Sequence, residues 1–182
     1  MELEKLNDRW RNASWSLAGI FPPLMQVVQQ LGRLDIQLRQ IDNSIDPYAL
    51  KQQDPPNFDL TMHLTHSYLW VLGAYEIARA VSQYSASNPD LFSESDKPRI
   101  TGMKRDIARL RIPLAKFEPA RKHRKTDYAF PMPGMSKDQG TVWAVSNNTV
   151  ISRSLLANSF LDVYENIRHS QRGDFTGYDK NT

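Results

Sequence analysis

The chain has 182 residues, which is long enough for one domain with a proper hydrophobic core and rather short for two. Hydrophobic residues make up 40% and charged residues 24%, so the composition is globular rather than disordered. No apolar run approaches the roughly 20 residues of a membrane span, and a net charge of +3 is too small to predict nucleic-acid binding by the whole molecule. Cysteine is absent, which excludes disulfides and thiolate chemistry. The charged N-terminus lacks the apolar stretch of a signal peptide, and we expect a cytoplasmic protein.

Apolar residues recur at helical spacing in five stretches of the chain. The second of them steps alternately by four and three residues, a period that packs well against a parallel or antiparallel helix. The third is apolar around much of its circumference, which predicts a central helix. A polar, proline-rich segment at residues 51–57 predicts a loop. The five stretches lie at residues 3–17, 27–45, 59–84, 100–117 and 156–167.

The pattern changes between the fourth and fifth stretches, where short segments are rich in aromatic and β-branched residues. We expect strands at TDYAF (126–130), GTVWAV (140–145) and TVIS (149–152), separated by PMPGMSKDQ and SNN. Asn147 and Asn148 tolerate the positive φ of a tight hairpin turn. Ser152 or Ser154 is suited to cap the helix that follows.

The predicted fold is therefore mainly α, an up-and-down bundle of about five helices with a small antiparallel β hairpin or sheet inserted before the last helix. We expect a single helical domain over residues 1–172, with the β insertion at about 126–152. Residues 173–182 are polar and contain two glycines, which predicts a flexible tail.

Pro113 lies inside the fourth stretch, where a proline removes one backbone hydrogen bond at a cost of about 3 kcal/mol unless the helix bends. The apolar spacing continues to Leu114 and Phe117, so we expect the helix to kink at Pro113 rather than end there, with both residues in the core. The same spacing argument places Trp10 and Trp70 in the core. Trp15 and Trp143 lie off the apolar stripes and are candidates for an interface.

Residues 109–125 carry seven lysine and arginine side chains against one carboxylate, Glu118. Such a run is suited to phosphate, because neutralising a phosphate backbone releases counterions. Cations near a helix C-terminus are also stabilised by the helix dipole without any ligand. The candidate nucleic-acid or phosphate-binding residues are Arg109, Arg121, Lys122, His123, Arg124 and Lys125.

Residues 111–118, Arg-Ile-Pro-Leu-Ala-Lys-Phe-Glu, resemble the Arg-x4-6-His motif of HEPN domains. These helical-bundle proteins are common in prokaryotic toxin, defence and RNA-processing systems. Active members cleave RNA without a metal, usually across a dimer interface, with the Arg, the His and often an acidic residue of an earlier helix. The resemblance implies catalytic positions at Arg111, Lys116 and Glu76. Lys116 stands where the motif has histidine, and lysine cannot shuttle protons near neutral pH unless its pKa is strongly lowered.

Two simpler interpretations apply to individual residues of the third stretch. Glu76 has Arg79 three residues later, which favours an intrahelical ion pair. His63 and His66 are also three residues apart, a spacing that can bind one metal, but zinc needs a further ligand and Asp59 lies one turn earlier. We expect no metal and no cofactor, because two histidines at the start of a helix are more often surface or capping groups.

The sequence leaves three functions open. In the first, a non-enzymatic HEPN-like protein acts by homodimerisation or by binding a protein partner, and binds RNA or a nucleotide through its basic helix end. In the second, a metal-independent ribonuclease of a toxin or defence system uses Arg111 and Glu76, with Lys116 or His123 as the proton-transfer group. In the third, a structural protein oligomerises through the apolar stripe at residues 27–45.

Overall fold

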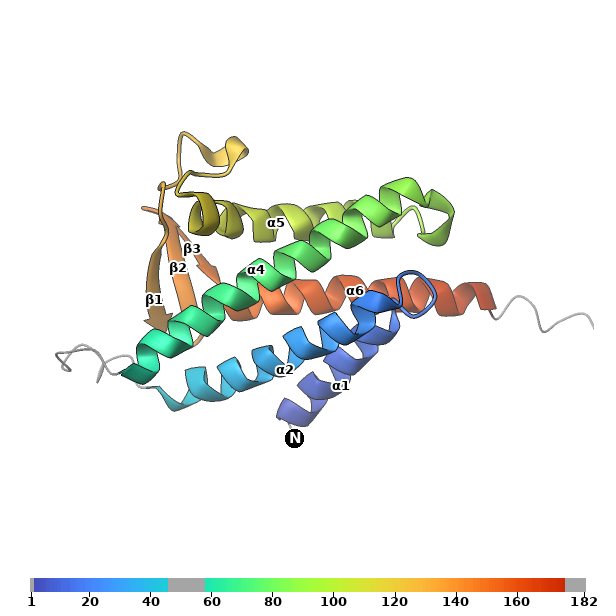
Figure 1. Ribbon diagram of the computed structural model, residues 1–182, viewed down its shortest axis with the longest axis horizontal. Coiled ribbons are helices and arrows are strands. Elements are labelled where there is room, and N and C mark those ends of the chain that lie inside the picture. The colour runs from blue at the N-terminus through green and yellow to red at the C-terminus, as the bar shows by residue number, and fades with distance from the viewer. Residues whose placement is uncertain (1, 46–57, 176–182) are drawn as a thin grey trace, which may run out of the picture.

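The computed structural model describes residues 2–45 and 58–175, and within the second range the side chains of residues 60–170. This part of the chain forms five α-helices and a three-stranded antiparallel sheet inserted before the last helix, which confirms the predicted fold class (Figure 1). The helices are α1 (Glu2–Trp15), α2 (Pro23–Ser44), α4 (Phe58–Ser87), α5 (Asp96–Lys116) and α6 (Arg153–Phe175). The strands are β1 (Met132–Ser136), β2 (Gly140–Ser146) and β3 (Thr149–Ser152), and short 3-10 helices lie at η1 (Pro89–Leu91) and η2 (Arg121–His123).

The five helices form a closed ring around one core. Each helix packs against the next along the chain, and α6 closes the ring by contacting both α5 and α1. Successive helices run in alternating directions, so the up-and-down arrangement is confirmed (Figure 1). The sheet contacts α2 and α6 through β2 and covers one end of the bundle.

Local chemistry fixes where several helices begin and end. Pro23 starts α2, where the ring of proline suits the first helical turn. Ser152 caps α6, because its Oγ accepts a hydrogen bond from the backbone N–H of Leu155 at 3.4 Å. The last helix continues to Phe175, so its described part runs three residues into the segment predicted to be a tail. The predicted loop at 51–57 and the last seven residues lie outside the described part.

The first strand lies further along the chain than predicted. Residues 126–130 form turns and bends, and β1 falls in the segment expected to be a connection. As an edge strand, β1 tolerates Pro133, because alternate N–H groups of such a strand face away from the sheet. The hairpin turn at Asn147 and Asn148 is confirmed, but neither residue has positive φ, and the register shifts near Ser146 instead.

Period-two burial along β2 explains a second correction. Thr141, Trp143 and Val145 share the face that packs on the helices and are buried, whereas the residues between them are only half-buried. The expectation that Trp143 marks an interface is therefore wrong, while Trp15 is 53% exposed. The predicted core positions of the other two tryptophans, Trp10 and Trp70, are confirmed.

The end of α5 departs from the predicted core. The helix does continue through Pro113 and buries Leu114, but it stops at Lys116. Phe117 then adopts a left-handed backbone with φ of 58°, and its N–H donates to the carbonyl oxygen of Pro113 at 3.0 Å. Helical spacing no longer applies to a residue in that conformation. Phe117 is 69% exposed, so its predicted place in the core is wrong.

Gly140 sets how closely the sheet approaches α2. Its φ is +64°, and a Cβ placed there would lie 2.3 Å from Cγ of Asp42. Both the backbone conformation and the close contact require glycine at the start of β2.

We predict that Gly140→Ala destabilises the protein by about 3 kcal/mol, from left-handed strain and overpacking together. Urea unfolding followed by tryptophan fluorescence measures the change. Gly102→Ala is the matched control: it lies inside α5 with open space around it and should stabilise by about 0.5 kcal/mol or more. Equal stability of Gly140→Ala and the unmodified chain would contradict this account of the sheet contact.

Candidate functional site

The structure brings together two of the three residues that the HEPN resemblance implies to be catalytic. Nη2 of Arg111 on α5 lies 3.4 Å from Oε1 of Glu76 on α4, and the Arg111 guanidinium lies over the ring of Tyr75 at 4.8 Å. Glu76 also pairs with Arg79 at 2.7 Å, which confirms the predicted intrahelical ion pair. Nε of Arg111 is buried without a hydrogen-bond partner in the structure.

Lys116, the third of these residues, is exposed at the last position of α5. Within the described residues no hydrogen bond or ion pair joins it to Arg111 or Glu76. Glu76 is about half exposed and accepts from two arginines, Arg79 and Arg111. Among the described residues, Arg111 and Glu76 thus lie together without a contact to Lys116, the position at which the motif has its histidine.

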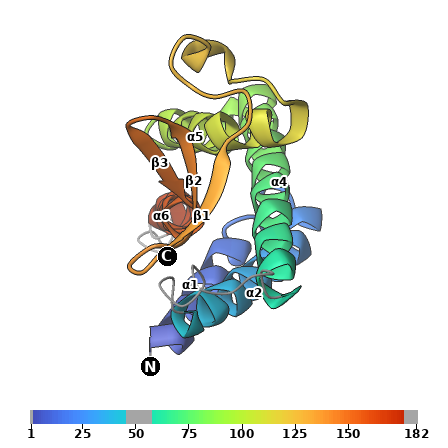
Figure 2. The same ribbon diagram turned by 90° about the vertical axis from the view of Figure 1, so that its left-hand side faces the viewer.

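The basic residues that follow sit on a projecting loop, residues 116–130, which we call the basic loop. In both ribbon views this loop stands out beyond α5 at one end of the bundle (Figures 1 and 2). Arg109 fixes its base by a two-pronged ion pair, donating from Nε and Nη2 to the Asp127 carboxylate at 2.8 and 2.9 Å. Nδ1 of His123 lies 4.0 Å from the same carboxylate, whose side chain is only 1% exposed. Arg109 and His123, predicted as phosphate ligands, are thus engaged within the protein.

The remaining cations of the basic loop are free of such contacts. They are all exposed, and none forms an ion pair with any residue in the described part of the chain. One carboxylate of the loop, Asp127, is committed to Arg109, which leaves Glu118 as the other acidic group on the loop. These free cations are Lys116, Arg121, Lys122, Arg124 and Lys125.

Two phenylalanines, one near each end of the basic loop, contact each other. The rings of Phe117 and Phe130 are stacked, with centroids 5.6 Å apart and planes within 14°. They border an apolar groove of about 400 Å³ between α4, the end of α5 and the strands β1 and β2. The sequence did not predict this groove, because the spacing put Phe117 in the core and the composition put Phe130 in a strand. The groove is lined by Thr61, Leu64, Thr65, Tyr68, Leu114, Phe117, Phe130, Pro133 and Trp143.

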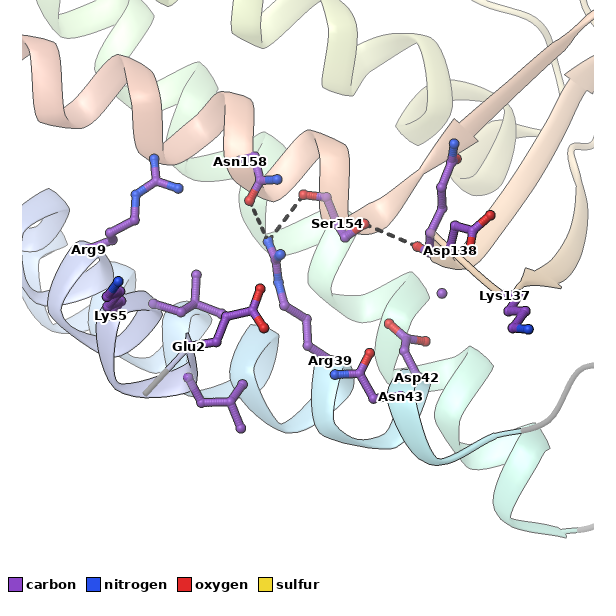
Figure 3. A pocket seen from close by; sticks show the side chains of 14 residues that line it. Glu2, Lys5, Arg9, Arg39, Asp42, Asn43, Lys137, Asp138, Ser154 and Asn158 are labelled. Atoms are coloured by element: carbon purple, nitrogen blue, oxygen red, sulfur yellow. Dashed lines mark hydrogen bonds between the residues drawn. The ribbon is translucent and has the colours of Figure 1, made fainter.

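A second, polar pocket of about 470 Å³ lies between α1, α2, α6 and the β1–β2 turn (Figure 3). Arg39 reaches across it, donating from Nη2 to Oδ1 of Asn158 at 2.8 Å and to the carbonyl oxygen of Ser154 at 3.2 Å. Its Nε donates to Asp35 at 3.0 Å. Arg9, on another wall, pairs with two carboxylates of α6.

Asp42 lies in the wall of this pocket and is tied into a buried network. Its Oδ2 accepts from Nη2 of the fully buried Arg153 at 2.6 Å, and its Oδ1 lies 2.8 Å from Nε2 of His63. The N–H of Thr141 donates to Oδ1 as well, at 3.0 Å. Burial by itself raises the pKa of the Asp42 carboxyl, but the hydrogen bonds from His63, Arg153 and Thr141 outweigh burial and hold that pKa below its usual value. A carboxylate so engaged is unsuited to exchange protons with a ligand.

His63 was predicted to be a surface or capping group, with a metal pair at His63 and His66 as the alternative. The structure contradicts the surface prediction: His63 is 2% exposed and contacts Asp42 and Thr141, whereas His66 is only half-buried. The searched, described residues hold no group of three histidine or acidic side chains suited to a metal. The side chain of Asp59 lies outside the described part.

The apolar stripe proposed for oligomerisation is divided between core and surface. Leu31 and Leu38, its central members, are buried within the chain, while Val27 and Ile41 are 47% and 40% exposed. A second subunit would therefore contact only the outer edge of the stripe.

Comparisons of the chain with protein-family models, curated protein sequences and solved structures give no match. Among the described residues, no helix is both long and apolar enough to cross a membrane. The HEPN resemblance thus depends on residues 111–118 and their contacts.

Replacing Asp127 tests the anchor of the basic loop. The hydrogen bond from Arg109 is the main reason that the pKa of Asp127 lies below its usual value, with the Thr126 hydroxyl adding to it against the effect of burial. We predict that Asp127→Asn costs about 1–2 kcal/mol of stability at pH 7. A lowered folded-state pKa stabilises above the unfolded value of about 3.9, so the deficit should shrink as pH falls below about 4.

Urea unfolding at pH 7 and pH 3 measures this difference. Asp106→Asn is the matched control, because Asp106 is 59% exposed and lies 3.7 Å from Arg105. It should change stability by less than about 0.5 kcal/mol. A loss that is the same for both variants, or that does not depend on pH, would contradict the anchoring role of Asp127.

Proposed function

We propose that this chain is a non-enzymatic, HEPN-like RNA-binding protein that holds the phosphate backbone with the basic loop. The observation that carries the proposal is the set of five exposed cations on a projecting loop, none of them paired with a carboxylate of the described residues. A cluster of like charges without carboxylates between them repels itself, which is unfavourable for the folded protein. A polyanion supplies the missing counter-charge and releases its own counterions on binding.

The spread of these cations favours a chain of phosphates over a single nucleotide. Lys116 lies at the end of α5, while the other four lie on η2 and the turn after it, so the cations are distributed over two separate parts of the loop. No glycine-rich phosphate loop is present beside them in the sequence. RNA is the polyanion that the resemblance at residues 111–118 favours.

We predict that a fluorescent 20-nucleotide single-stranded RNA binds with strong salt dependence. Four to five phosphate contacts give a slope of log K against log salt of roughly −3, so affinity should fall about 50- to 100-fold between 50 and 200 mM salt. Reversing Arg121, Lys122, Arg124 and Lys125 to Glu should abolish binding at 50 mM salt. Fluorescence anisotropy titrations measure both effects.

The control is a second quadruple variant with the same change in net charge. Arg11, Arg33, Arg99 and Arg105 are exposed and lie on α1, α2 and α5, away from the basic loop. Reversing them to Glu should weaken binding by less than about tenfold, since only the long-range field changes. An equal loss in both variants, or no binding by the unmodified chain at low salt, would refute the proposed function.

The contact between Arg111 and Glu76 favours one alternative, a metal-independent ribonuclease. An arginine beside a carboxylate could stabilise a phosphorane-like charge, but a proton-transfer group would have to come from Lys116, His123 or a second subunit. Our expectation is that RNA incubated with the chain stays intact on a denaturing gel and that Arg111→Ala changes nothing. Cleavage that disappears in Arg111→Ala, but persists in the matched surface variant Arg105→Ala, would support the alternative instead.

A further inference from the structure

We infer that the apolar groove beside the basic loop receives an unpaired RNA base, stacked on Phe117, so that the protein prefers single-stranded to duplex RNA. This inference rests on the proposed function, because it assigns a place to the base whose phosphates the loop would hold. The groove and the loop share Phe117 and Phe130, which line the groove and bracket four of the five free cations in the sequence.

Phe117 is poorly explained by folding alone. It occupies the position after the helix end in a left-handed conformation, with φ of 58°, where glycine is strongly favoured. Its ring is 69% exposed and therefore gains little from core packing. A strained backbone at a residue whose side chain is exposed is a reason to look for function there. The stack on Phe130 holds the ring in place and leaves much of its surface open to solvent.

The groove has the chemistry of a base rather than of a phosphate. Its lining contains no charged side chain, and aromatic or aliphatic groups such as Tyr68 and Trp143 form most of it. The lining also includes Thr61 and Tyr68, whose hydroxyls are suited to hydrogen bond with the polar edge of a base. A volume of about 400 Å³ lies within the range of small-ligand sites.

The groove suits the base of a nucleotide, and the neighbouring cations suit its phosphate. Aromatic and apolar groups line the groove, while the free cations of the basic loop begin at Lys116, immediately before Phe117. A single strand can place a base on an aromatic ring while its backbone follows the cations. In a duplex the bases are stacked on each other and paired, so the groove would remain empty. A second copy of the chain would cover the apolar surface but would leave the neighbouring cations without counter-charge.

Phe117→Gly gives a sharp test, because glycine suits the observed φ and keeps the helix end intact. Anisotropy titrations with one 12-nucleotide RNA, alone and annealed to its complement, should show at least tenfold tighter binding of the single strand by the unmodified chain. Loss of one stacked base should weaken single-strand binding by about 5- to 150-fold in Phe117→Gly and leave duplex binding unchanged. Phe117→Tyr keeps the ring and should bind as the unmodified chain does.

A fluorescent base reports stacking directly. The fluorescence of one 2-aminopurine in the RNA should be quenched on binding to the unmodified chain and to Phe117→Tyr, but not on binding to Phe117→Gly. Urea unfolding should show that Phe117→Gly is at least as stable as the unmodified chain, which separates loss of binding from loss of folding.

Each opposite result has its own meaning. Equal affinity for single strand and duplex, or unchanged single-strand binding by Phe117→Gly, overturns the groove as a base site while the proposed function stands. Unchanged RNA affinity with a dimer that becomes a monomer in Phe117→Gly, measured by light scattering, overturns it in favour of self-association. Absence of binding to either RNA at low salt removes the proposed function and this inference with it.

Discussion

A buried polar network joins α2, α4, α6 and the sheet, and its central cation belongs to Arg153. Arg153 is the first residue of α6 and pairs with two carboxylates of α2, Asp35 and Asp42. Asp42 in turn contacts His63 of α4 and Thr141 of β2. Leaving one of these buried charges unpaired would be strongly destabilising, so the ion pairs favour the observed arrangement of α2, α4, α6 and the sheet. Hydrophobic packing is non-directional, whereas these ion pairs form only where the charged groups of α2 and α6 meet.

The network also fixes the part of the molecule that carries the basic loop. By holding Thr141 it holds β2, whose Trp143 lines the apolar groove and whose Val145 accepts a hydrogen bond from the N–H of Tyr128 at 2.7 Å. The adjacent Asp127 anchors the same end of the loop to Arg109 of α5, and the other end of the loop begins at Lys116, the last residue of that helix. A loop fixed at both ends presents its cations at a defined place, and less conformational entropy is lost when a ligand orders it.

The helices followed from the sequence because their signal is local: residues three and four apart share a face, and prolines or glycines mark the ends. The polar network gave no such signal. Asp42, His63 and Arg153 are far apart in the chain, and each alone is compatible with a surface position. Phe117 was misplaced for a related reason, since the apolar period extends to it while the backbone leaves the helix one residue earlier. The run of basic residues is visible in the sequence. Only the structure shows that Arg109 pairs with Asp127 and Arg111 with Glu76.

The basic residues at 109–125 have two explanations, stabilisation by the dipole of the helix and binding of a phosphate, and the positions of the unpaired cations bear on both. The dipole of α5 attracts cations only within its last turn, which accounts for Lys116 but not for the four cations on η2 and beyond. Those four lie within five residues of one another and repel, at a place where the fold offers them no carboxylate. Their repulsion is partly screened by salt and is relieved much further by a bound polyanion. The structure therefore holds a local concentration of cations without carboxylate partners among the described residues, beside an exposed aromatic ring, and both would be used by the single-stranded RNA that we propose as the ligand.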